Sequence, residues 1–492
     1  MININYSLFV LASIFSLSID CNAQQTSGRI SVKVYTSSSE GDRLTRKPDK
    51  EFTKITSITS AIKIDDSRIF QRIDGFGATF NEAGMICINS LSEEQRNKVF
   101  TSLFDSAKGA GFTLMKSPIA ACDFASAGPW YSYDSISDDT LMNRFSIERD
   151  LASNGLISFI KQAKKYGNFQ IESPMDFAPD WMYYSLKPGE KHIKLQYYPA
   201  LARYYSKYLQ MYAAAGVQID FLNLFNEADN SWYSNETYKE IGELIRDYIV
   251  PRLRADGLST KIQFGESSSR PEAIKKFPSG LDLPGVTEVV HSLTVHGYDW
   301  NNFSSLTALH NRYPLLPIWM TEVCYAYSSA VNNIPPGGPT HMPVYGFEDG
   351  EFWGNMIVND MKNRVSGWIY WNMVLDETGG PWLVSVEHGD PVKNPQHPVV
   401  IINRKTKKVT YTGLYYYLTH FSKFVRPGAY RIYCSASNNP ELNLVAFKNP
   451  DGTIVLNVIN NGQAANFKVE WNQKLIIQKL KSHSITTFLW KG

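Results

Sequence analysis

Two glutamates at the ends of apolar segments have the residue type and placement that acid–base and nucleophilic chemistry require. Glu227 follows Asn226 inside the stretch from Asp220 to Asp229, and Glu322 lies inside the stretch from Leu315 to Cys324. Both stretches are short and apolar, which is typical of buried strands in an α/β protein. Parallel-sheet enzymes place their reacting groups at the carboxyl ends of strands, so these carboxylates are predicted to form a pair suited to cleaving a glycosidic bond. Taken singly, either glutamate could instead be an exposed strand-end residue.

A repeating strand–helix pattern is predicted to position this pair. From Gly75 onward, strand-like and helical segments alternate, and eight strands can be counted. Such repetition predicts a (β/α)8 barrel, assigned to residues 69–424. The predicted strands begin at Gly75 and continue at 112–120, 169–174, 220–229, 261–266, 292–298, 315–324 and 365–372. Helices are predicted at 147–166, 198–214, 238–254 and 352–363.

Both ends of the chain show a different pattern from the barrel segment. After Pro427-Gly428 come short alternating runs separated by turn sequences, which predict an all-β module over residues 425–492. Residues 24–68 hold similar short runs and are predicted to complete that module. The predicted fold class is therefore α/β: a (β/α)8 barrel with an attached β-sandwich built from both chain termini.

Composition excludes some classes of partner. The chain has 492 residues, of which 43% are hydrophobic and 20% charged, and this suits one large enzyme domain with a smaller one. A formal net charge of +2 gives no basis for a nucleic-acid partner. The 28 Tyr, 26 Phe and 11 Trp include enough aromatic rings to line a sugar-binding cleft, although ordinary core packing accounts for most of them.

The first 23 residues resemble an export signal. The apolar stretch from Leu8 to Leu17 is too short to span a bilayer, and small residues precede a cleavage point after Ala23. Lipid attachment at Cys21 is disfavoured because Asp20 stands where a small residue is expected. The sequence thus predicts an exported protein, periplasmic or extracellular, with no membrane span. The remaining cysteines have no metal-binding or redox spacing, and neither a metal nor a cofactor is predicted.

Nine motifs in the same order resemble glycoside hydrolase family 30, the glucosylceramidase family. They cover most of the chain after the export signal. The motifs are GFGATFNEAG at 75–84, SPIAACDF at 117–124, ESPMDFAPDWM at 172–182, LFNEA at 224–228, VHGY at 295–298, MTEVC at 320–324, GWIYWNMVLDETGGPW at 367–382, YYYLTHFSKFVRPGAYRI at 415–432 and HSITTFLW at 483–490. The fold that this resemblance implies, a (β/α)8 barrel with a β-sandwich made from both chain ends, agrees with the fold predicted above.

The resemblance also implies roles for individual residues. It assigns Glu227 as the acid/base and Glu322 as the nucleophile of a retaining enzyme. A negative Glu322 nearby, together with partial burial, is predicted to raise the pKa of Glu227. The expected substrate-binding residues are Asp123, Trp181, Asn226, His296, Tyr298 and Trp371. Within this set Asn226 is expected to bond the sugar 2-OH and Tyr298 to hold the nucleophile, whereas His296 could equally be a satisfied strand-end histidine and Trp371 a core residue.

Several positions depart from the family pattern. Lys116 stands where Arg is usual, Gly297 replaces a bulky aromatic residue, Ala228 replaces Pro, and Trp382 follows Pro381 without an intervening Asn. Since Gly297 is expected to open the cleft, the substrate is predicted to be a β-linked glucan or glucoside, with β-1,6-glucan first and glucosylceramide beside it. The alternatives are a β-xylosidase or β-fucosidase of the same family, or an inactive carbohydrate-binding protein.

Overall fold

The computed structural model describes residues 1, 29–55, 60–125, 130–230, 232–325, 347, 349–381 and 395–492. The predicted export signal, apart from Met1, and Trp382 lie outside the described residues.

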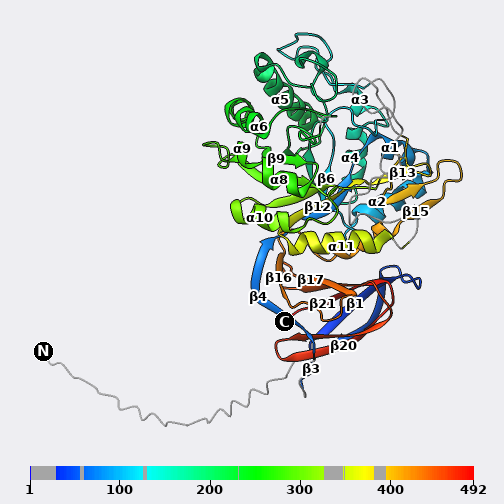
Figure 1. The fold of residues 1–492 in the computed structure, drawn as a ribbon. Coiled ribbons are helices and arrows are strands. Elements are labelled where there is room, and N and C mark those ends of the chain that lie inside the picture. Colours follow the sequence, from blue (N-terminus) through cyan, green and yellow to red (C-terminus); the bar gives the residue numbers. More distant parts are fainter. Residues whose placement is uncertain are drawn as a thin grey trace.

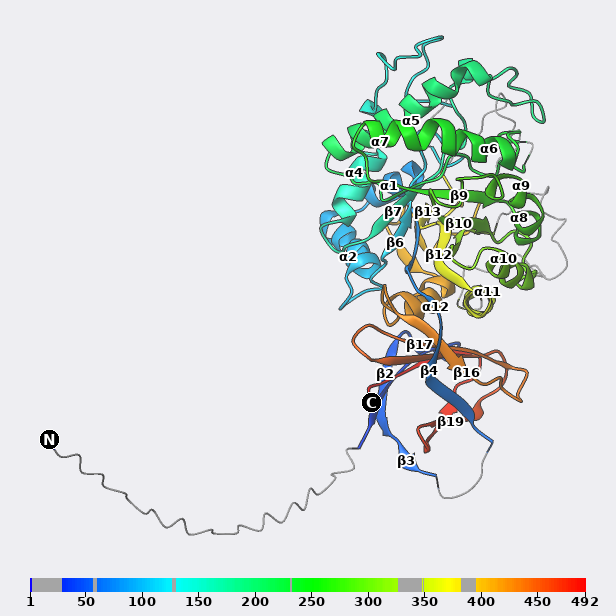
Figure 2. The ribbon, with the colours of Figure 1, turned by 90° about the vertical axis from the view of Figure 1, so that its left-hand side faces the viewer.

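Eight parallel strands form a closed barrel, as the sequence predicted (Figures 1 and 2). Each strand pairs with the next along the chain, and the last pairs with the first. The strands are β5 (Gly75–Thr79), β6 (Leu114–Lys116), β7 (Gln170–Ser173), β8 (Phe221–Leu222), β9 (Lys261–Ser267), β10 (Val290–His296), β11 (Ile318–Glu322) and β12 (Val365–Asn372). All eight residues of β12 are buried, which is why its sequence shows no alternation of polar and apolar residues.

Helices surround the barrel, and the predicted ranges 198–214, 238–254 and 352–363 each contain helix. The helices are α1 (Glu82–Asn89), α2 (Glu93–Phe104), α3 (Glu148–Leu151), α4 (Leu156–Ala163), α5 (Tyr198–Ala214), α6 (Tyr238–Leu244), α7 (Val250–Ala255), α8 (Arg270–Lys276), α9 (Pro278–Leu281), α10 (Ser304–Arg312), α11 (Asp349–Lys362) and α12 (Gly413–Ser422). The single helix predicted over 147–166 is wrong, because the chain breaks there into α3 and α4. Gly155 sits at this break, where a Cβ would lie 2.4 Å from the carbonyl oxygens of Arg149 and Asp150.

The β-sandwich is built from both ends of the described chain, as predicted. In its ten-stranded sheet, β1 pairs with β21, and β4 lies between β16 and β19. Helices α11 and α12 pack between the barrel and the sandwich strands (Figure 2). The strands are β1 (Ser31–Ser38), β2 (Thr45–Glu51), β3 (Thr53–Lys54), β4 (Ile62–Arg72), β16 (Tyr430–Cys434), β17 (Leu442–Lys448), β18 (Ile454–Asn460), β19 (Ala465–Trp471), β20 (Lys474–Leu480) and β21 (Ser484–Trp490).

A small third sheet, which the sequence did not predict, follows the last barrel strand. It consists of β13 (Val374–Asp376), β14 (Val400–Ile402) and β15 (Val409–Tyr411). Among the described residues, no helix combines the length and apolar character that crossing a membrane requires.

Candidate active site

Glu227 and Glu322 come together at the carboxyl end of the barrel. Glu322 is the last residue of β11, and Glu227 follows β8 by five residues. Each is 6% exposed, and one carboxylate oxygen of Glu227 lies within 4.8 Å of one of Glu322. Retaining glycosidases keep their two carboxyl groups about 5–5.5 Å apart, whereas inverting enzymes leave a wider gap for water. The observed proximity fits the retaining arrangement.

A cavity of about 310 Å³ opens beside the two carboxylates. Its walls include four of the six residues predicted to bind substrate, namely Asp123, Asn226, Tyr298 and Trp371. The other lining residues are Glu227, Asn230, Tyr233, Ser268, Trp300, Glu322, Cys324 and Gln396. A few polar groups among aromatic walls are typical of a site that binds a small polar ligand.

Two donors hold the Glu322 carboxylate from different sides. The Tyr298 hydroxyl donates to Glu322 Oε1 at 2.9 Å, and Lys116 Nζ donates to Oε2 at 3.0 Å. Burial alone would lower the pKa of Lys116, but the carboxylates of Glu266, Glu322 and Glu172 outweigh burial and raise that pKa. Lys116 is therefore a buried ammonium group that holds one oxygen of Glu322 in place.

Glu227 has its own pair of donors. His296 Nδ1 lies 2.9 Å from Glu227 Oε1, and Asn230 Nδ2 donates to Oε2 at 2.8 Å. Its backbone is in the left-handed region with φ of +45°, and its N–H donates to the Glu266 carbonyl oxygen at 2.9 Å. Glu227 lines the cavity in this conformation.

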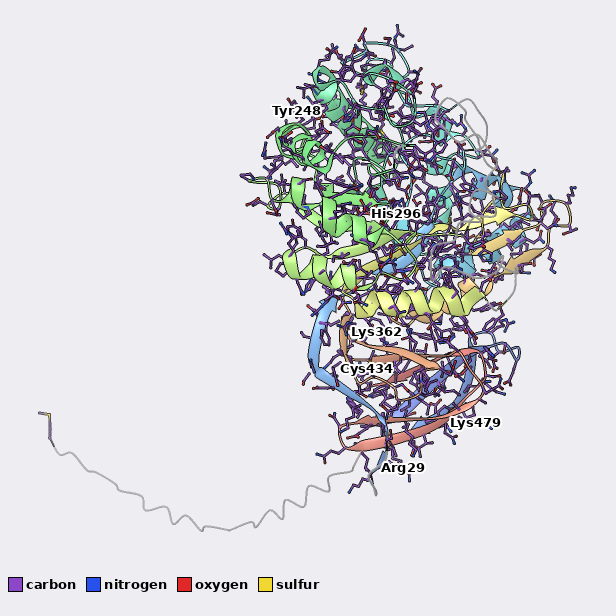
Figure 3. The ribbon with its side chains drawn as sticks, viewed as in Figure 1. Arg29, Tyr248, His296, Lys362, Cys434 and Lys479 are labelled. Atoms are coloured by element: carbon purple, nitrogen blue, oxygen red, sulfur yellow. The ribbon has the colours of Figure 1, made fainter. Side chains whose placement is uncertain are left out.

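His296 does not line the cavity, and the prediction that it contacts substrate needs correction. The side chain is 0% exposed and lies inside the barrel (Figure 3). Its Nε2 lies 3.0 Å from Glu266 Oε2, so both ring nitrogens have protein partners. Burial would lower the pKa of His296, but Glu322 and Glu266 outweigh burial and raise it to about 10. His296 is thus a buried cation that contacts Glu227 from behind.

The remaining predicted residues differ in their exposure to the cavity. Asn226 is buried, and its Oδ1 has no hydrogen-bond partner within the described part of the chain, so this atom is available to a sugar hydroxyl. Trp371 is 5% exposed and lies on the cavity wall. Trp181 is not among the described residues that line the cavity. Its indole N–H donates to the Asp134 carbonyl oxygen at 3.0 Å, and its ring packs edge-on against Tyr197.

The sequence matches known family domains over nearly the whole described chain. Residues 73–425 match the glycosyl hydrolase family 30 TIM-barrel domain. The chain belongs to glycosyl hydrolase family 30. Residues 428–488 match the β-sandwich domain of the same family. This confirms the resemblance found in the sequence motifs and identifies the protein as a glycoside hydrolase that acts on carbohydrate.

Relatives and solved structures of family 30 support this assignment. Putative glucosylceramidase 3 of Caenorhabditis elegans is 29% identical over 483 residues, covering 93% of this chain and 88% of that protein. An endo-1,6-β-D-glucanase of Neurospora crassa is 28% identical over 388 residues, covering 75% of this chain and 74% of that protein. A solved endo-β1,6-glucanase shares the fold with a TM-score of 0.78 at 22% identity, covering 94% of this chain and 99% of that one.

The structure accounts for two of the departures from the expected family 30 pattern, those at Gly297 and Lys116. The sequence predicted that Gly297 opens the cleft, and this prediction is wrong. A Cβ at this position would lie 3.0 Å from Val323 Cγ2 and 3.4 Å from an Arg270 guanidinium nitrogen, so the space is already filled. Lys116 takes the place of an arginine as the cation beside Glu322.

Sequence reasoning missed Glu266 and Glu172, two further buried glutamates. Both side chains are 0% exposed within the barrel, on β9 and β7. The predicted strand over 261–266 ends in Glu266, and the predicted strands over 220–229 and 315–324 end near Glu227 and Glu322 in the same way. The strand-end position could therefore have identified Glu266 as a candidate site residue. Burial and the nearby Glu266 raise the pKa of Glu172 well above its usual range.

The Cys324 thiol lies in the cavity wall but is not suited to act as a nucleophile. Burial raises its pKa well above the usual range, and Sγ contacts Gln396 Oε1 at 3.1 Å. A protonated, buried thiol is unreactive. Cys87, Cys122 and Cys434 are also free.

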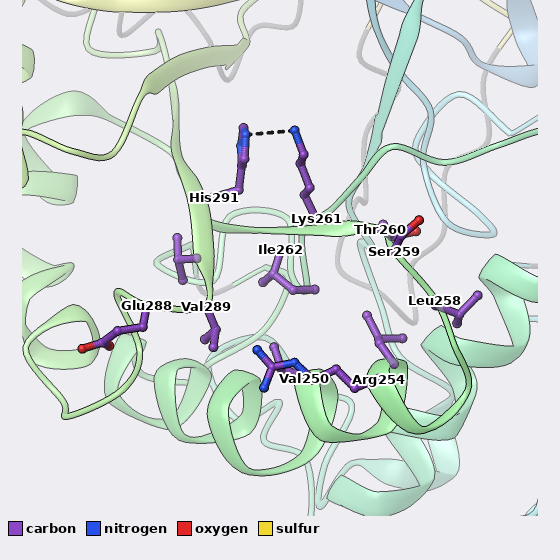
Figure 4. A pocket seen from close by; sticks show the side chains of 12 residues that line it. Val250, Arg254, Leu258, Ser259, Thr260, Lys261, Ile262, Glu288, Val289 and His291 are labelled. Carbon is purple, nitrogen blue, oxygen red and sulfur yellow. Dashed lines mark hydrogen bonds between the residues drawn. The ribbon is translucent and has the colours of Figure 1, made fainter.

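A second cavity of about 310 Å³ lies at the amino ends of β9 and β10, away from the paired carboxylates (Figure 4). It is lined by Lys261, His291 and Glu288 among others, and Lys261 Nζ lies 3.3 Å from His291 Nε2. Its lining contains one carboxylate, and this end of a TIM barrel typically serves stability.

Proposed function

We propose that this retaining β-glycosidase cleaves a β-linked glucan, with β-1,6-glucan as the first candidate, and uses Glu322 as nucleophile and Glu227 as acid/base. The observation that carries this proposal is the pair of carboxylate oxygens within 4.8 Å at the wall of a polar cavity. Two relatives named as endo-1,6-β-glucanases, from Neurospora crassa and Trichoderma harzianum, favour the linkage.

The proposed reaction has two steps. Glu322, held in place by Lys116 and Tyr298, attacks the anomeric carbon while Glu227 gives a proton to the leaving oxygen. A covalent glycosyl–enzyme forms with inverted configuration. Glu227 then takes a proton from water, the water attacks the same carbon, and Glu322 leaves, which restores the original configuration. Asn226 binds the 2-OH of the sugar through its free Oδ1, and this contact strengthens in the transition state.

We further propose that the protein is exported, to the periplasm or the cell exterior. The apolar segment from Leu8 to Leu17 with small residues before Gln24 supports this location. An exported enzyme would meet polymeric glycans there, which is consistent with a glucan substrate.

A substrate panel tests the proposal. Purified protein is incubated with β-1,6-, β-1,3- and β-1,4-glucans, aryl β-glucosides, β-xylosides and β-fucosides, and glucosylceramide, and the product anomers are followed by NMR. We expect β-1,6-glucan to be cleaved with the β-anomer appearing first. Cleavage of only β-xylosides or β-fucosides would overturn the choice of sugar, and initial release of the α-anomer would overturn the assignment of Glu322. No cleavage of any member would favour a carbohydrate-binding protein.

Trp232 lies close in sequence to the acid/base Glu227. Its position favours a substrate whose leaving group is a saccharide. Its side chain is 43% exposed, and its backbone N–H donates to Asn230 Oδ1 at 3.1 Å. Asn230 in turn bonds Glu227, and the buried Lys191 ammonium donates to the Trp232 carbonyl oxygen. These contacts fix the backbone of Trp232 beside Asn230, and we propose that its exposed indole stacks on the leaving-group sugar.

Replacing Trp232 by Ala is expected to raise KM for β-linked oligosaccharides about 3- to 10-fold, because one aromatic contact is lost. Hydrolysis of a glycosyl fluoride, whose leaving group is a single atom, should stay within about twofold of wild type. Tyr430→Ala, which removes a 40% exposed ring from the sandwich, is the matched control. Equal effects on both substrates would show that Trp232 does not contact the leaving group.

A further inference from the structure

We propose that Glu266 is a positioning residue that holds both catalytic carboxylates in place through two buried cations. The inference rests on the roles proposed above for Glu227 and Glu322. It assigns a function to a side chain that does not line the cavity and does not touch the substrate.

Glu266 is the centre of a fully buried polar cluster. Its Oε2 accepts hydrogen bonds from Lys116 Nζ at 2.5 Å and from His296 Nε2 at 3.0 Å. Its Oε1 accepts one from Thr321 Oγ1 at 2.6 Å. Every one of these side chains comes from a different barrel strand, so the Glu266 carboxylate ties β6, β10 and β11 to β9.

Each of the two cations extends from Glu266 to one catalytic carboxylate. Lys116 Nζ is 3.0 Å from Glu322 Oε2, and His296 Nδ1 is 2.9 Å from Glu227 Oε1. His296 Nδ1 is also 3.7 Å from Glu322 Oε1. A shift of Glu266 would therefore move both donors, and with them the two groups that must stay aligned for the reaction.

Electrostatics explain why this position needs an anion. Burial would raise the pKa of Glu266, but Lys116 and His296 outweigh burial and bring the pKa below its usual range. In return, the Glu266 carboxylate helps to keep both cations protonated. Removing one charge from a buried ion cluster leaves its partners uncompensated, which costs far more than losing a surface pair. The titratable groups that face this cluster are Lys116, Glu172, Asp176, Glu227, Tyr238, His296, Tyr298 and Glu322.

The backbone of Glu266 reinforces the same arrangement. Glu266 is left-handed with φ of +54°, as is Glu227, and the carbonyl oxygen of Glu266 accepts the N–H of Glu227 at 2.9 Å. The Glu266 N–H donates to Thr294 Oγ1 at 2.8 Å. A substitution that preserves the shape of the side chain leaves these backbone contacts intact and tests the charge alone.

The test is Glu266→Gln, compared with wild type in kcat, KM and pH profile on the best substrate of the panel. We expect kcat to fall about 10²-fold, because the reacting groups lose their alignment, with little change in KM. Without the Glu266 charge the pKa of His296 falls, so His296 loses its proton at lower pH. Loss of that proton weakens the contact that holds Glu227 Oε1, so the alkaline limb of the kcat profile should move to lower pH.

Two further variants separate charge from structure. Glu266→Asp keeps the negative charge, so the alkaline limb of its kcat profile should lie at the same pH as in the wild-type enzyme. Glu172→Gln changes another buried carboxyl, 3.9 Å from Lys116, whose oxygens accept no hydrogen bond from the described residues, and should leave the limb where it is in wild type. Two results for Glu266→Gln would overturn the proposal. One is an unchanged kcat, and the other is a lower kcat with the alkaline limb at its wild-type pH. These outcomes are distinct from failure of the proposed function, which would appear as an inactive or inverting wild-type enzyme.

A direct measurement covers the case in which Glu266→Gln does not fold. In the wild-type protein, the imidazole signals of His296 can be followed by NMR as a function of pH, with His296→Asn as the assignment control. We expect His296 to stay protonated through pH 8, because its pKa is raised to about 10. Titration near 6.5, the value of a free histidine, would overturn the proposal.

Discussion

Glu322→Gln is expected to lower kcat on the order of 10⁵- to 10⁶-fold on every glycoside that the wild-type enzyme cleaves, because the amide cannot form the glycosyl–enzyme bond. The amide has nearly the shape of the carboxylate and can still accept a hydrogen bond from Tyr298. The fold and substrate binding should therefore persist, and the loss should appear in kcat. Steady-state kinetics, together with thermal unfolding of both proteins, measures the effect.

The role of Glu322 can be distinguished from general damage by adding a small nucleophile. In Glu322→Gly, azide can enter the vacated space, attack an activated β-glycoside from the opposite face and give an α-glycosyl azide. Glu288→Gln, at an exposed position beside the second cavity, is the matched control and should behave as wild type. If Glu322→Gln kept more than a few per cent of wild-type activity, Glu322 would not be the nucleophile.

Glu227→Ala is expected to divide substrates by their leaving groups. For saccharides, which need a proton on departure, kcat/KM should fall about 10³-fold or more. For a dinitrophenyl β-glycoside, which leaves without a proton, the first step should proceed and the glycosyl–enzyme should accumulate, because no base activates water. Stopped-flow kinetics would record a burst of dinitrophenol followed by a slow phase.

Azide again provides the decisive product. In Glu227→Ala, azide should attack the accumulated intermediate, accelerate the slow phase and give a β-glycosyl azide, whereas the wild-type enzyme should give none. The opposite anomers from the Glu227 and Glu322 variants would assign the two roles independently. Equal losses on both kinds of substrate, with no burst and no azide product, would contradict the assignment of Glu227 as acid/base.

The sequence predicted the fold and the carboxylate pair because both depend on local patterns. The strand at 365–372 and the helix at 198–214 were predicted with the observed bounds, since β12 is a continuous run of buried residues and α5 has helical periodicity. Glu227 and Glu322 were found because each follows such a strand. In a closed barrel, strand ends meet at one rim, so position along the chain was enough to bring the pair together.

The contacts behind the pair could not be predicted in the same way. Whether His296 faces substrate or packs inside depends on which strands neighbour β10, and the structure shows Glu266 and Glu227 on either side of its ring. Gly297 was misinterpreted for a similar reason, because Val323 on another segment fills the space beside it. The small sheet of β13, β14 and β15 was missed because three-residue strands carry too little pattern.

The pairing of β1 with β21 has a consequence for how the protein is made. Lys33 on β1 lies opposite Leu489 on β21, so the two strands leave the ribosome roughly half a minute or more apart. All eight barrel strands emerge within that interval and can close before the sandwich is complete. Until β21 arrives, β1 keeps an unpaired edge that chaperones or proteases can reach. We therefore expect the barrel, which carries the chemistry, to become resistant to proteolysis before the sandwich does.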